Sequence, residues 1–321
     1  MHPLPNRRAR QLASPLGGDV REGAGPSGVP RVERLVGEVV STATREVRTF
    51  AAVVSSNVLI ALLPALVTIL AAARFSGTEP VRSVCFGGVH FLLAICVFDL
   101  SNQIVGVPED RVNKPSRPLV TGLLTLRGAW WRLAAATVAL LFSGWLLGIV
   151  HLALLWVVVA GANNHLGLAK RPFLKPLIVG VQAGIQLLSA WQVGGGEPAR
   201  FVPCVIAVSA LLMLLMPLQD LRDVAGDRCM GRRTLPLVYG ARAVRIYLCV
   251  GFLLTPVAVR LLVEAHVLWT GGWVEAVAAV ICAATAVRVV TLRSPASDDA
   301  TYRLLVLWYT AMAAAPLAAT F

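Results

Sequence analysis

The stretch FLLAICVFDLSNQIVGVPEDRVNKPSRP (residues 91–118) begins as an apolar run and ends as a cluster of acids, bases and prolines. An apolar run of this kind predicts a membrane-spanning helix, and the polar residues that follow are expected at its mouth. The same order of acids, bases and proline recurs in QDLRDVAGDRCMGRRTLP (219–236), which also follows an apolar run. The two stretches therefore predict two polar clusters at the ends of membrane helices.

The composition of the whole chain is that of a membrane protein. Its 321 residues are 57% hydrophobic and only 14% charged, with a mean hydropathy of +0.72, whereas a soluble domain carries roughly 25% charged residues. Most gaps between the apolar windows are short, which favours antiparallel packing of neighbouring helices. We therefore predict an all-α, polytopic membrane protein with nine transmembrane helices. The windows lie near residues 50–73, 83–101, 128–147, 150–168, 174–193, 201–219, 244–264, 269–291 and 302–320.

The net charge of +12 is explained by topology, without a nucleic-acid partner. If the N-terminus lies in the cytoplasm and nine helices alternate, all but four of the 29 Lys and Arg residues fall on the cytoplasmic side. The exceptions are Arg74, Arg82, Arg200 and Arg260. This asymmetry is the positive-inside pattern, so we expect a multi-pass protein with a cytoplasmic N-terminus and no nucleic-acid binding.

The N-terminal segment differs from the rest of the chain. Its first 35 residues are rich in Pro, Gly and Arg and contain no apolar stretch of signal-peptide length. We expect residues 1–45 to form a disordered, basic cytoplasmic tail and residues 46–321 to form one transmembrane domain. The six cysteines show no C-x-x-C spacing and are expected to be reduced packing residues.

Three carboxylates of the second polar stretch are spaced to share one helix face. Asp220, Asp223 and Asp227 stand at i, i+3 and i+7. Their charges repel one another, and each would cost about 2.5–3.5 kcal/mol at the bilayer centre. A divalent cation and the bases that follow would offset this repulsion.

The first polar stretch shows a similar spacing with fewer acids. Asn102, Gly106 and Glu109 recur at i, i+4 and i+7, and Asp110 follows directly. We expect Pro108 to kink or end the helix, which would turn Glu109 and Asp110 inward.

Carboxylates without histidine or cysteine partners suit Mg²⁺ better than zinc. Mg²⁺ usually bridges one or two carboxylates to substrate phosphates, and the nearby bases Lys114, Arg117, Arg232 and Arg233 can bind phosphate oxygens directly. The sequence thus predicts a diphosphate head at the cytoplasmic rim and an apolar tail among the helices. In the alternative interpretation the bases only satisfy the positive-inside rule and pair with the acids in loops. Topology does not call for three aligned acids, which favours the metal site.

These motifs resemble those of the UbiA superfamily of intramembrane prenyltransferases. DLRDVAGDRCMGRRTLP (220–236) is similar to the family's second motif, D-x-x-D-x-x-x-D followed by a basic G-R-x-T-x-P stretch. NKPSRPLVTG (113–122) resembles the segment after the first motif, and LAKRPFLKPLIVG (168–180) resembles the basic loop after the fourth helix. The resemblance covers about residues 45–320. It implies a catalytic nine-helix bundle whose central cavity opens to the cytoplasm.

The resemblance also implies roles for individual residues. Mg²⁺ held by Asp110, Asp220, Asp223 and Asp227 would clamp an isoprenyl diphosphate. Asn102 would take the place of the family's opening Asn, which contacts metal or phosphate. The expected catalytic set is Asn102, Glu109, Asp110, Asp220, Asp223 and Asp227. The bases expected to bind the diphosphate are Lys114, Arg117, Lys170, Arg232 and Arg233.

The first motif departs from the family pattern. The usual N-D-x-x-D-x-x-x-D reads N-Q-x-x-G-x-x-E-D here, with Gln103 and Gly106 where acids are expected and Glu109 added beside Asp110. This variant looks more like a subgroup that includes the membrane terpene cyclase of fungal fumagillin biosynthesis. There the allylic cation is captured by the substrate's own double bonds.

The expected function is therefore cyclisation of a farnesyl- or geranylgeranyl-class diphosphate to a terpene. The alternative is transfer of the prenyl group to an aromatic or other small acceptor. A transporter is a remote alternative, because its acids are expected near mid-membrane on broken helices.

Several other side chains are candidates for the cavity wall. Tryptophan faces can stabilise a cation by about 0.5–2 kcal/mol, although tryptophan is also enriched at bilayer interfaces. The tryptophans concerned are Trp130, Trp131, Trp145, Trp156 and Trp191. Asn163, Asn164 and His165, and more weakly Gln182 and Gln186, are expected to face the cavity or to bond across helices.

Overall fold

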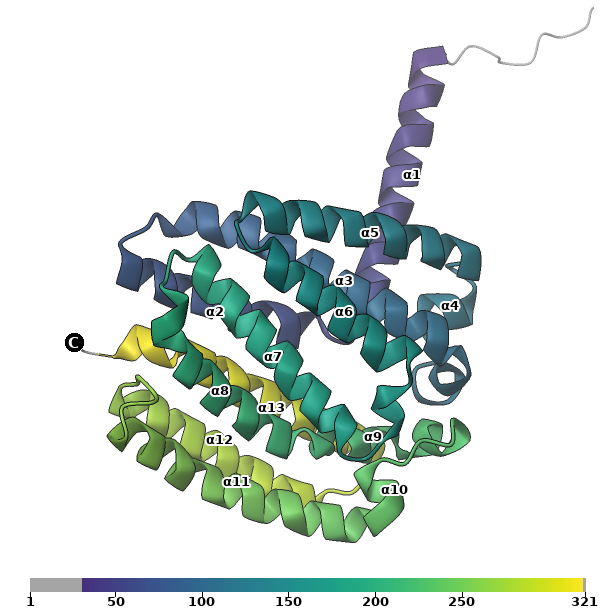
Figure 1. The fold of residues 1–321 in the computed structure, drawn as a ribbon. Coiled ribbons are helices and arrows are strands. Elements are labelled where there is room, and N and C mark those ends of the chain that lie inside the picture. The colour runs from purple at the N-terminus through teal and green to yellow at the C-terminus, as the bar shows by residue number, and fades with distance from the viewer. Residues whose placement is uncertain (1–30, 320–321) are drawn as a thin grey trace, which may run out of the picture. The chain divides into compact units, whose positions relative to one another are not determined.

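The computed structural model describes residues 31–319, and the secondary structure of this range is entirely helical (Figure 1). The predicted all-α class is therefore confirmed. The elements are α1 (Arg31–Val54), α2 (Val58–Ser76), α3 (Pro80–Asn113), α4 (Pro118–Thr121), α5 (Leu126–Leu146), α6 (Val150–His165), η1 (Leu168–Lys170), α7 (Leu174–Val193), α8 (Pro198–Leu215), α9 (Pro217–Cys229), α10 (Leu235–Tyr239), α11 (Ala241–Glu264), α12 (Gly272–Thr291), α13 (Pro295–Ala314) and η2 (Ala315–Ala318).

All nine apolar windows correspond to helices, but not all of these helices have the length and composition of a membrane span. Within residues 31–319, seven helices are long and apolar enough to cross a bilayer, namely α2, α3, α5, α7, α8, α11 and α12. The window at 150–168 forms α6, which has only 16 residues. The window at 302–320 forms the later part of α13, whose first turns carry Asp298, Asp299 and Arg303. The count of nine spans thus stays a prediction.

The predicted N-terminal tail is partly helical. A cytoplasmic tail over residues 1–45 stays a prediction, since residues 1–30 lie outside the described range, and residues 31–45 belong to α1. This segment contains no proline, and Leu35, Val36, Val39 and Val40 recur at helical spacing. The chain divides into two units between Arg45 and Glu46. Every feature described below belongs to the unit that begins at Glu46.

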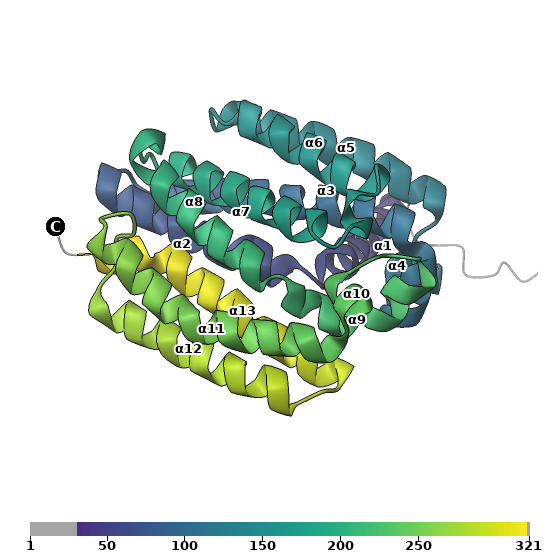
Figure 2. The ribbon, with the colours of Figure 1, turned by 60° about the horizontal axis from the view of Figure 1, so that its bottom comes forward.

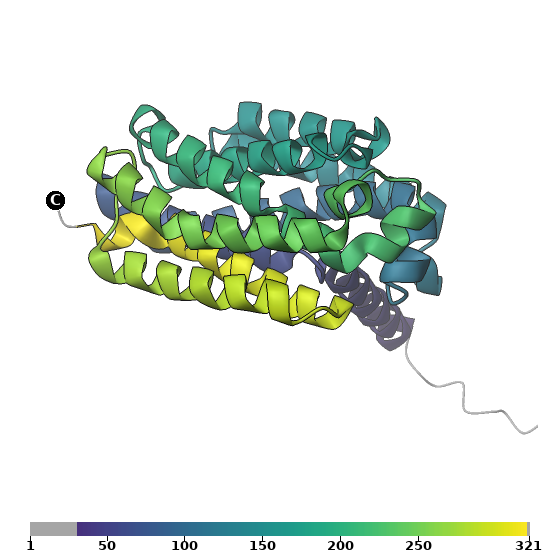
Figure 3. The same ribbon diagram turned by 90° about the horizontal axis from the view of Figure 1, so that it is seen from below.

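The helices from α2 onward form a bundle. In Figures 1 and 2, α11 and α12 lie side by side along one edge of the bundle, and α5 and α6 lie along the opposite edge. Figure 3 shows the α11–α12 edge in front. The short helices α4, α9 and α10 gather at one end. This end also holds the C-terminus of α3 and the N-terminus of α7 (Figure 1).

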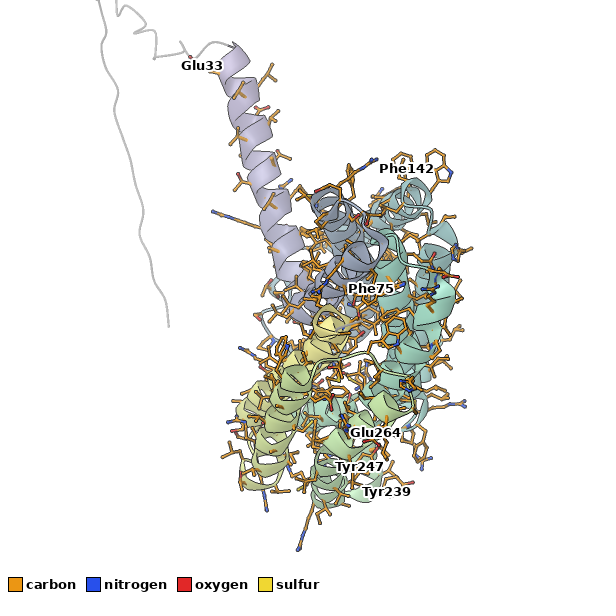
Figure 4. The ribbon with its side chains drawn as sticks, turned by 90° about the vertical axis from the view of Figure 1, so that its left-hand side faces the viewer. Glu33, Phe75, Phe142, Tyr239, Tyr247 and Glu264 are labelled. Carbon is orange, nitrogen blue, oxygen red and sulfur yellow. The ribbon has the colours of Figure 1, made fainter. Side chains whose placement is uncertain are left out.

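Apolar side chains fill the inside of the bundle and also cover its outside. Trp308 and Tyr309 of α13 are completely buried, which places this helix in the core. Large apolar residues on the outer helices are instead exposed, for example Val138 of α5 and Val280 of α12, each 69% exposed. Phe142 projects from α5 in the same way (Figure 4). An apolar surface of this extent suits contact with lipid.

Prolines shape the two polar motifs in different ways. α8 ends at Leu215 and α9 begins at Pro217, so the acidic triplet lies on a separate short helix and not on a continuous sixth span. Proline is well suited to this first helical position because it has no N–H to satisfy. In the first motif, α3 does not end at Pro108 but continues to Asn113. Of the two expected outcomes, an end of the helix at Pro108 is thus excluded, and a kink there stays a prediction.

Candidate active site

A cavity of about 970 Å³, including its open mouth, lies among α2, α3, α6, α7, α8, α9 and α13. Its charged lining residues are Glu109, Lys114, Lys175, Asp223 and Arg232. Its apolar lining includes Ile60, Ile95, Phe98, Trp156, Leu212 and Met216. These residues come from the end of α3, the start of α7, α9 and the segment that follows α9. These elements meet at the same end of the bundle. The cavity thus has a charged mouth and an apolar interior.

The face of α7 that lines the cavity shows this change from a charged mouth to a less polar interior most clearly. Lys175, Val179, Gln182 and Gln186 all line the cavity and stand at i, i+4, i+7 and i+11 on one helix face. At a rise of about 1.5 Å per residue, this stripe spans roughly 16 Å from the charged mouth inward. The depth suits a long apolar tail that hangs from a charged head.

The first motif contributes two residues to the cavity wall. Asn102 and Glu109 line the cavity, whereas Asp110 is buried beside it. Both oxygens of Asp110 accept hydrogen bonds from Nη1 of Arg117, at 2.8 and 2.7 Å. Gln103, which stands where the family has an acid, is completely buried and donates from Nε2 to the carbonyl of Val53 at 2.9 Å. Gln103 therefore ties the last turn of α1 to α3 and does not line the cavity.

The second motif contributes one carboxylate to the wall. Asp223 lines the cavity, while Asp220 is buried and paired with Lys175 through its Oδ1, with Nζ 2.5 Å away. Asp227 is completely buried. Its Oδ1 lies 3.2 Å from Nη1 of Arg232, and its Oδ2 has no hydrogen-bond partner within residues 31–319.

The two motifs meet in space although more than a hundred residues separate them. Arg232 lies 2.6 Å from Oε2 of Glu109 in the first motif and 3.2 Å from Oδ1 of Asp227 in the second. The side chain of Asn113 accepts a hydrogen bond from the N–H of Gly226 and donates one to the carbonyl of Asp223. A Cβ at Gly226 would lie 2.2 Å from Nδ2 of Asn113, so this close approach requires glycine.

The five predicted diphosphate-binding bases are not equally placed. Lys114 and Arg232 line the main cavity. Lys170 lines a smaller cavity of about 310 Å³, which shares Asn102, Asn163 and Arg232 with the main one. Arg117 is buried against Asp110, and Arg233 is exposed. Neither of these two arginines lines either cavity.

The charges at the mouth shift one another's protonation. Burial alone would raise the pKa of Asp223, but Lys114, Arg222 and other nearby cations outweigh it and hold the pKa below its ordinary value. Burial, assisted by Arg117, lowers the pKa of Lys114. Asp223 lies on α9, outside the membrane helices, and its low pKa favours an ionised carboxylate on the cavity wall.

The donor set at the mouth is compatible with Mg²⁺ bound jointly with a ligand. Within residues 31–319, no three acid, histidine or cysteine side chains converge into a complete metal cage. Mg²⁺ seldom needs such a cage, because it keeps several waters and takes one or two carboxylates plus substrate phosphates. Asp223 on the cavity wall and the unpartnered Oδ2 of Asp227 supply oxygen donors of this kind.

Sequence reasoning missed several residues of the cavity. Lys175 was overlooked, although it lies in the quoted basic stretch and shares a helix face with Gln182 and Gln186. Tyr302 and Tyr309 of α13 also line the cavity. Their i, i+7 spacing was a usable signal, but one face of a helix in an apolar window cannot be assigned to a cavity or to lipid from sequence alone.

A buried pair beside the cavity was missed as well. Asp99 of α3 is completely buried, and its Oδ1 accepts a hydrogen bond from Nδ2 of Asn57 at 2.5 Å. Asn57 itself lines the cavity just before α2.

The five tryptophans predicted as candidates for the cavity wall are not all placed there. Of the five tryptophans, Trp156 lines the cavity beside Phe98, whose ring centroid lies 6.4 Å away. Trp130, Trp131 and Trp145 are exposed on the outer surface, and Trp191 stacks on Phe201 away from the cavity.

The polar candidates behave as expected. Asn163, Gln182 and Gln186 line the cavity. Asn164 and His165 bond across helices to the hydroxyl of Ser101. All six cysteines are free.

Comparison with known proteins identifies the family of this chain. The sequence profile of the UbiA prenyltransferase family matches residues 61–311. The chain belongs to the UbiA prenyltransferase family. The match covers α3 and α9, so it includes both acidic motifs. As a member of this family, the protein is an integral, multi-pass membrane enzyme that depends on isoprenyl diphosphate.

Individual relatives and solved structures are similar to this chain. The somaliensene A/B synthase of Streptomyces somaliensis is 39% identical over 264 residues, which is 80% of this chain and 87% of that protein. The diterpene cyclase eriG of Hericium erinaceus is 36% identical over 47% of this chain and 50% of its own length. A solved structure of a UbiA homolog from Archaeoglobus fulgidus bound to GPP and Mg²⁺ superimposes with a TM-score of 0.59 at 14% identity, covering 82% of this chain and 98% of that one. This last likeness shows the shared fold.

Proposed function

We propose that this UbiA-family protein ionises an isoprenyl diphosphate of the farnesyl or geranylgeranyl class and cyclises it to a terpene, with release of diphosphate. The observation that carries this proposal is a continuous cavity with a charged mouth and an apolar, aromatic interior. The mouth suits a diphosphate head, and the interior suits a folded prenyl tail and excludes bulk water. The similarity to somaliensene A/B synthase supports cyclisation over prenyl transfer.

At the mouth, the bases would bind and stabilise the leaving group. Lys114, Lys175 and Arg232 line the cavity and carry the positive charge needed as negative charge develops on the diphosphate. Arg117, Lys170 and Arg233 would support this site from outside the main cavity wall. Asn102, between the mouth and Phe98 on α3, would orient the head group.

We propose that Mg²⁺ is held at this mouth by Asp223 and Asp227, with Asp110 and Asp220 as the further carboxylates of the two motifs. When bound, Mg²⁺ would neutralise the diphosphate and make it a better leaving group. Asp110 and Asp220 are paired with Arg117 and Lys175, so these two acids can bind metal only if their bases turn to the diphosphate. Glu109 contacts Arg232, which fits a role in positioning this base.

Inside the cavity, Phe98 and Trp156 present aromatic surface to the prenyl chain. An aromatic face near a cation stabilises it by about 0.5–2 kcal/mol. The apolar walls from Ile95 and Leu212 would hold the chain folded, so that its own double bonds reach the allylic cation.

We also propose that the N-terminus and the mouth of the cavity face the cytoplasm. The mouth lies at the end of the bundle that carries Lys114, Lys170 and Arg232, and the positive-inside rule places such an end in the cytoplasm.

The test is incubation of the purified protein with Mg²⁺ and farnesyl or geranylgeranyl diphosphate alone, followed by mass spectrometry of the extracted products. A cyclic terpene formed without any acceptor is the expected result. Substrate that stays intact until a phenolic acceptor is added would instead establish prenyl transfer. Transport of prenyl diphosphate across liposomes without its consumption, unaffected by Asp220→Ala, would contradict both enzyme functions.

A further inference from the structure

The side-chain amide nitrogen of Gln182, on the wall of the cavity, lacks a protein partner within the part of the chain that the structure describes. Gln182 of α7 is only 6% exposed and lines the cavity. Within residues 31–319, no protein group accepts a hydrogen bond from its Nε2. A buried donor left without a partner costs about 1–3 kcal/mol. The chain keeps this amide in an interior that otherwise suits a hydrocarbon.

The neighbouring amide of α7 is satisfied, which sets Gln182 apart. Nε2 of Gln186 donates to the carbonyls of Ile60 and Ala61, at 3.0 and 2.6 Å. Oε1 of Gln186 accepts a hydrogen bond from the hydroxyl of Tyr309 at 3.1 Å. Gln186 thus ties α2, α7 and α13 together, whereas Gln182 makes no such tie through its Nε2.

Hydrogen-bond acceptors lie near the unpartnered Nε2 of Gln182. The hydroxyl of Tyr309 also lies 3.4 Å from the carbonyl of Ala183, the residue next to Gln182. Because this hydroxyl donates its single proton to α7, its oxygen lone pairs are left to accept. Side chains at i and i+4 of a helix are neighbours, so Gln182 and Gln186 lie within reach of one small ligand. The site thus offers Nε2 of Gln182 as a donor and the oxygens of Gln186 and Tyr309 as acceptors.

We propose that Gln182, Gln186 and Tyr309 form a subsite that binds one water molecule, which captures the final carbocation and makes the product a terpene alcohol. This inference rests on the proposed cyclase function. A buried water needs two to four polar partners and a polar site, which these side chains supply. Phe98 and Trp156 line the same cavity and would stabilise the cation that water attacks.

In this reaction the oxygen of water replaces diphosphate on the terpene skeleton. The C–O bond to diphosphate breaks, and carbon–carbon bonds form within the prenyl chain. An oxygen lone pair of the bound water then forms a new C–O bond to the last cation. The proton lost by this water passes to the released diphosphate. The net change converts a prenyl diphosphate and water into a cyclic alcohol and diphosphate.

The test is turnover of geranylgeranyl diphosphate by the full-length protein with Mg²⁺ in water enriched in ¹⁸O, with gas chromatography and mass spectrometry of the products. We expect a cyclic alcohol that carries ¹⁸O. In Gln182→Met, which keeps the side-chain length but removes the amide, the ratio of alcohol to hydrocarbon should fall roughly tenfold, the effect of about one net hydrogen bond. Tyr309→Phe should lower the same ratio.

Val181→Met is the matched control, because Val181 is 43% exposed on the outer side of α7 and does not line the cavity. Its product ratio should equal that of the wild type. Cyclic hydrocarbons without ¹⁸O from the wild type would overturn the water subsite and leave the cyclase function standing. An unchanged ratio in Gln182→Met would also overturn the subsite. No diphosphate release without an added acceptor would overturn both proposals.

Discussion

Several acids of this site form ion pairs with specific bases, as Asp110 does with Arg117 and Asp220 with Lys175. These pairs affect both the stability of the protein and the binding of ligands. Asp220 is 2% exposed and depends on Lys175, which is itself only 14% exposed at its side chain. Removal of one partner from a buried ion pair leaves a charge that neither water nor a counter-ion stabilises. Stability and catalysis are therefore coupled at these positions and have to be separated by double variants.

Lys175→Met should destabilise the protein by about 3–5 kcal/mol, because it leaves Asp220 buried and unpaired. We expect a lower melting temperature in detergent together with a large loss of turnover. The double variant Lys175→Met/Asp220→Leu should recover most of the melting temperature but not the turnover. Wild-type melting and turnover in the single variant would contradict the pairing and the proposed contact of Lys175 with diphosphate.

Asp223→Asn should reduce turnover at least about a hundredfold, since it removes the ionised carboxylate on the cavity wall that we propose as a metal ligand. The variant should still elute as a folded protein in size-exclusion chromatography. Glu197→Gln is a suitable control, because Glu197 is exposed and lies just before α8 at the other end of the bundle. Comparable turnover in the two variants would remove Asp223 from the site.

The chemistry of these residues was predictable, but their positions were only partly so. The spacing of Asp220, Asp223 and Asp227 predicts one helix face, yet only Asp223 reaches the cavity wall. Lys175 was missed because nothing in a run of three bases shows which one faces inward. Its partner lies 45 positions away, and such pairing depends on tertiary packing that no local pattern contains.

Whole helices were the most predictable elements, because long apolar windows leave few other solutions in a membrane. All nine windows became helices. Their ends were less predictable. α3 continues through Pro108 to Asn113, and a break before Pro217 separates α9 from α8. A proline is compatible with either outcome, and contacts with neighbouring helices decide which one occurs.

Close packing between α2 and α7 provides a test at the level of helices. Gly194 caps α7, and a Cβ there would lie 2.5 Å from the carbonyl oxygen of Ile69 and 2.6 Å from Cβ of Ala72. Gly194→Ala should therefore push the two helices apart and destabilise the protein by about 1–3 kcal/mol. The melting temperature in detergent should fall accordingly.

Gly161→Ala is the matched control for this packing. A Cβ at Gly161 of α6 would meet no atom within 4 Å, and alanine favours a helix over glycine by about 1 kcal/mol. Its melting temperature should be equal to or above that of the wild type. Equal melting temperatures of Gly194→Ala and Gly161→Ala would contradict the close contact between α2 and α7.

The distribution of charges is the basis on which we propose a cytoplasmic mouth for the cavity. Cys229 is exposed at the end of α9, next to the mouth of the cavity. In a Cys85→Ser background, which removes the other exposed cysteine, a membrane-impermeant maleimide should label Cys229 in inverted vesicles and not in intact cells. Additional Cys229→Ser should abolish the label. Labelling from outside intact cells would place the mouth on the opposite side of the membrane.

The central claim of the proposed function is that two acidic motifs on different helices bind one diphosphate. The most direct measurement is the affinity for farnesyl thiodiphosphate, a slowly ionising substrate analogue, with Mn²⁺ in place of Mg²⁺. We predict metal-dependent binding that Asp110→Asn in the first motif and Asp223→Asn in the second each weaken at least tenfold. Binding of wild-type strength in either variant would show that its motif takes no part in the site.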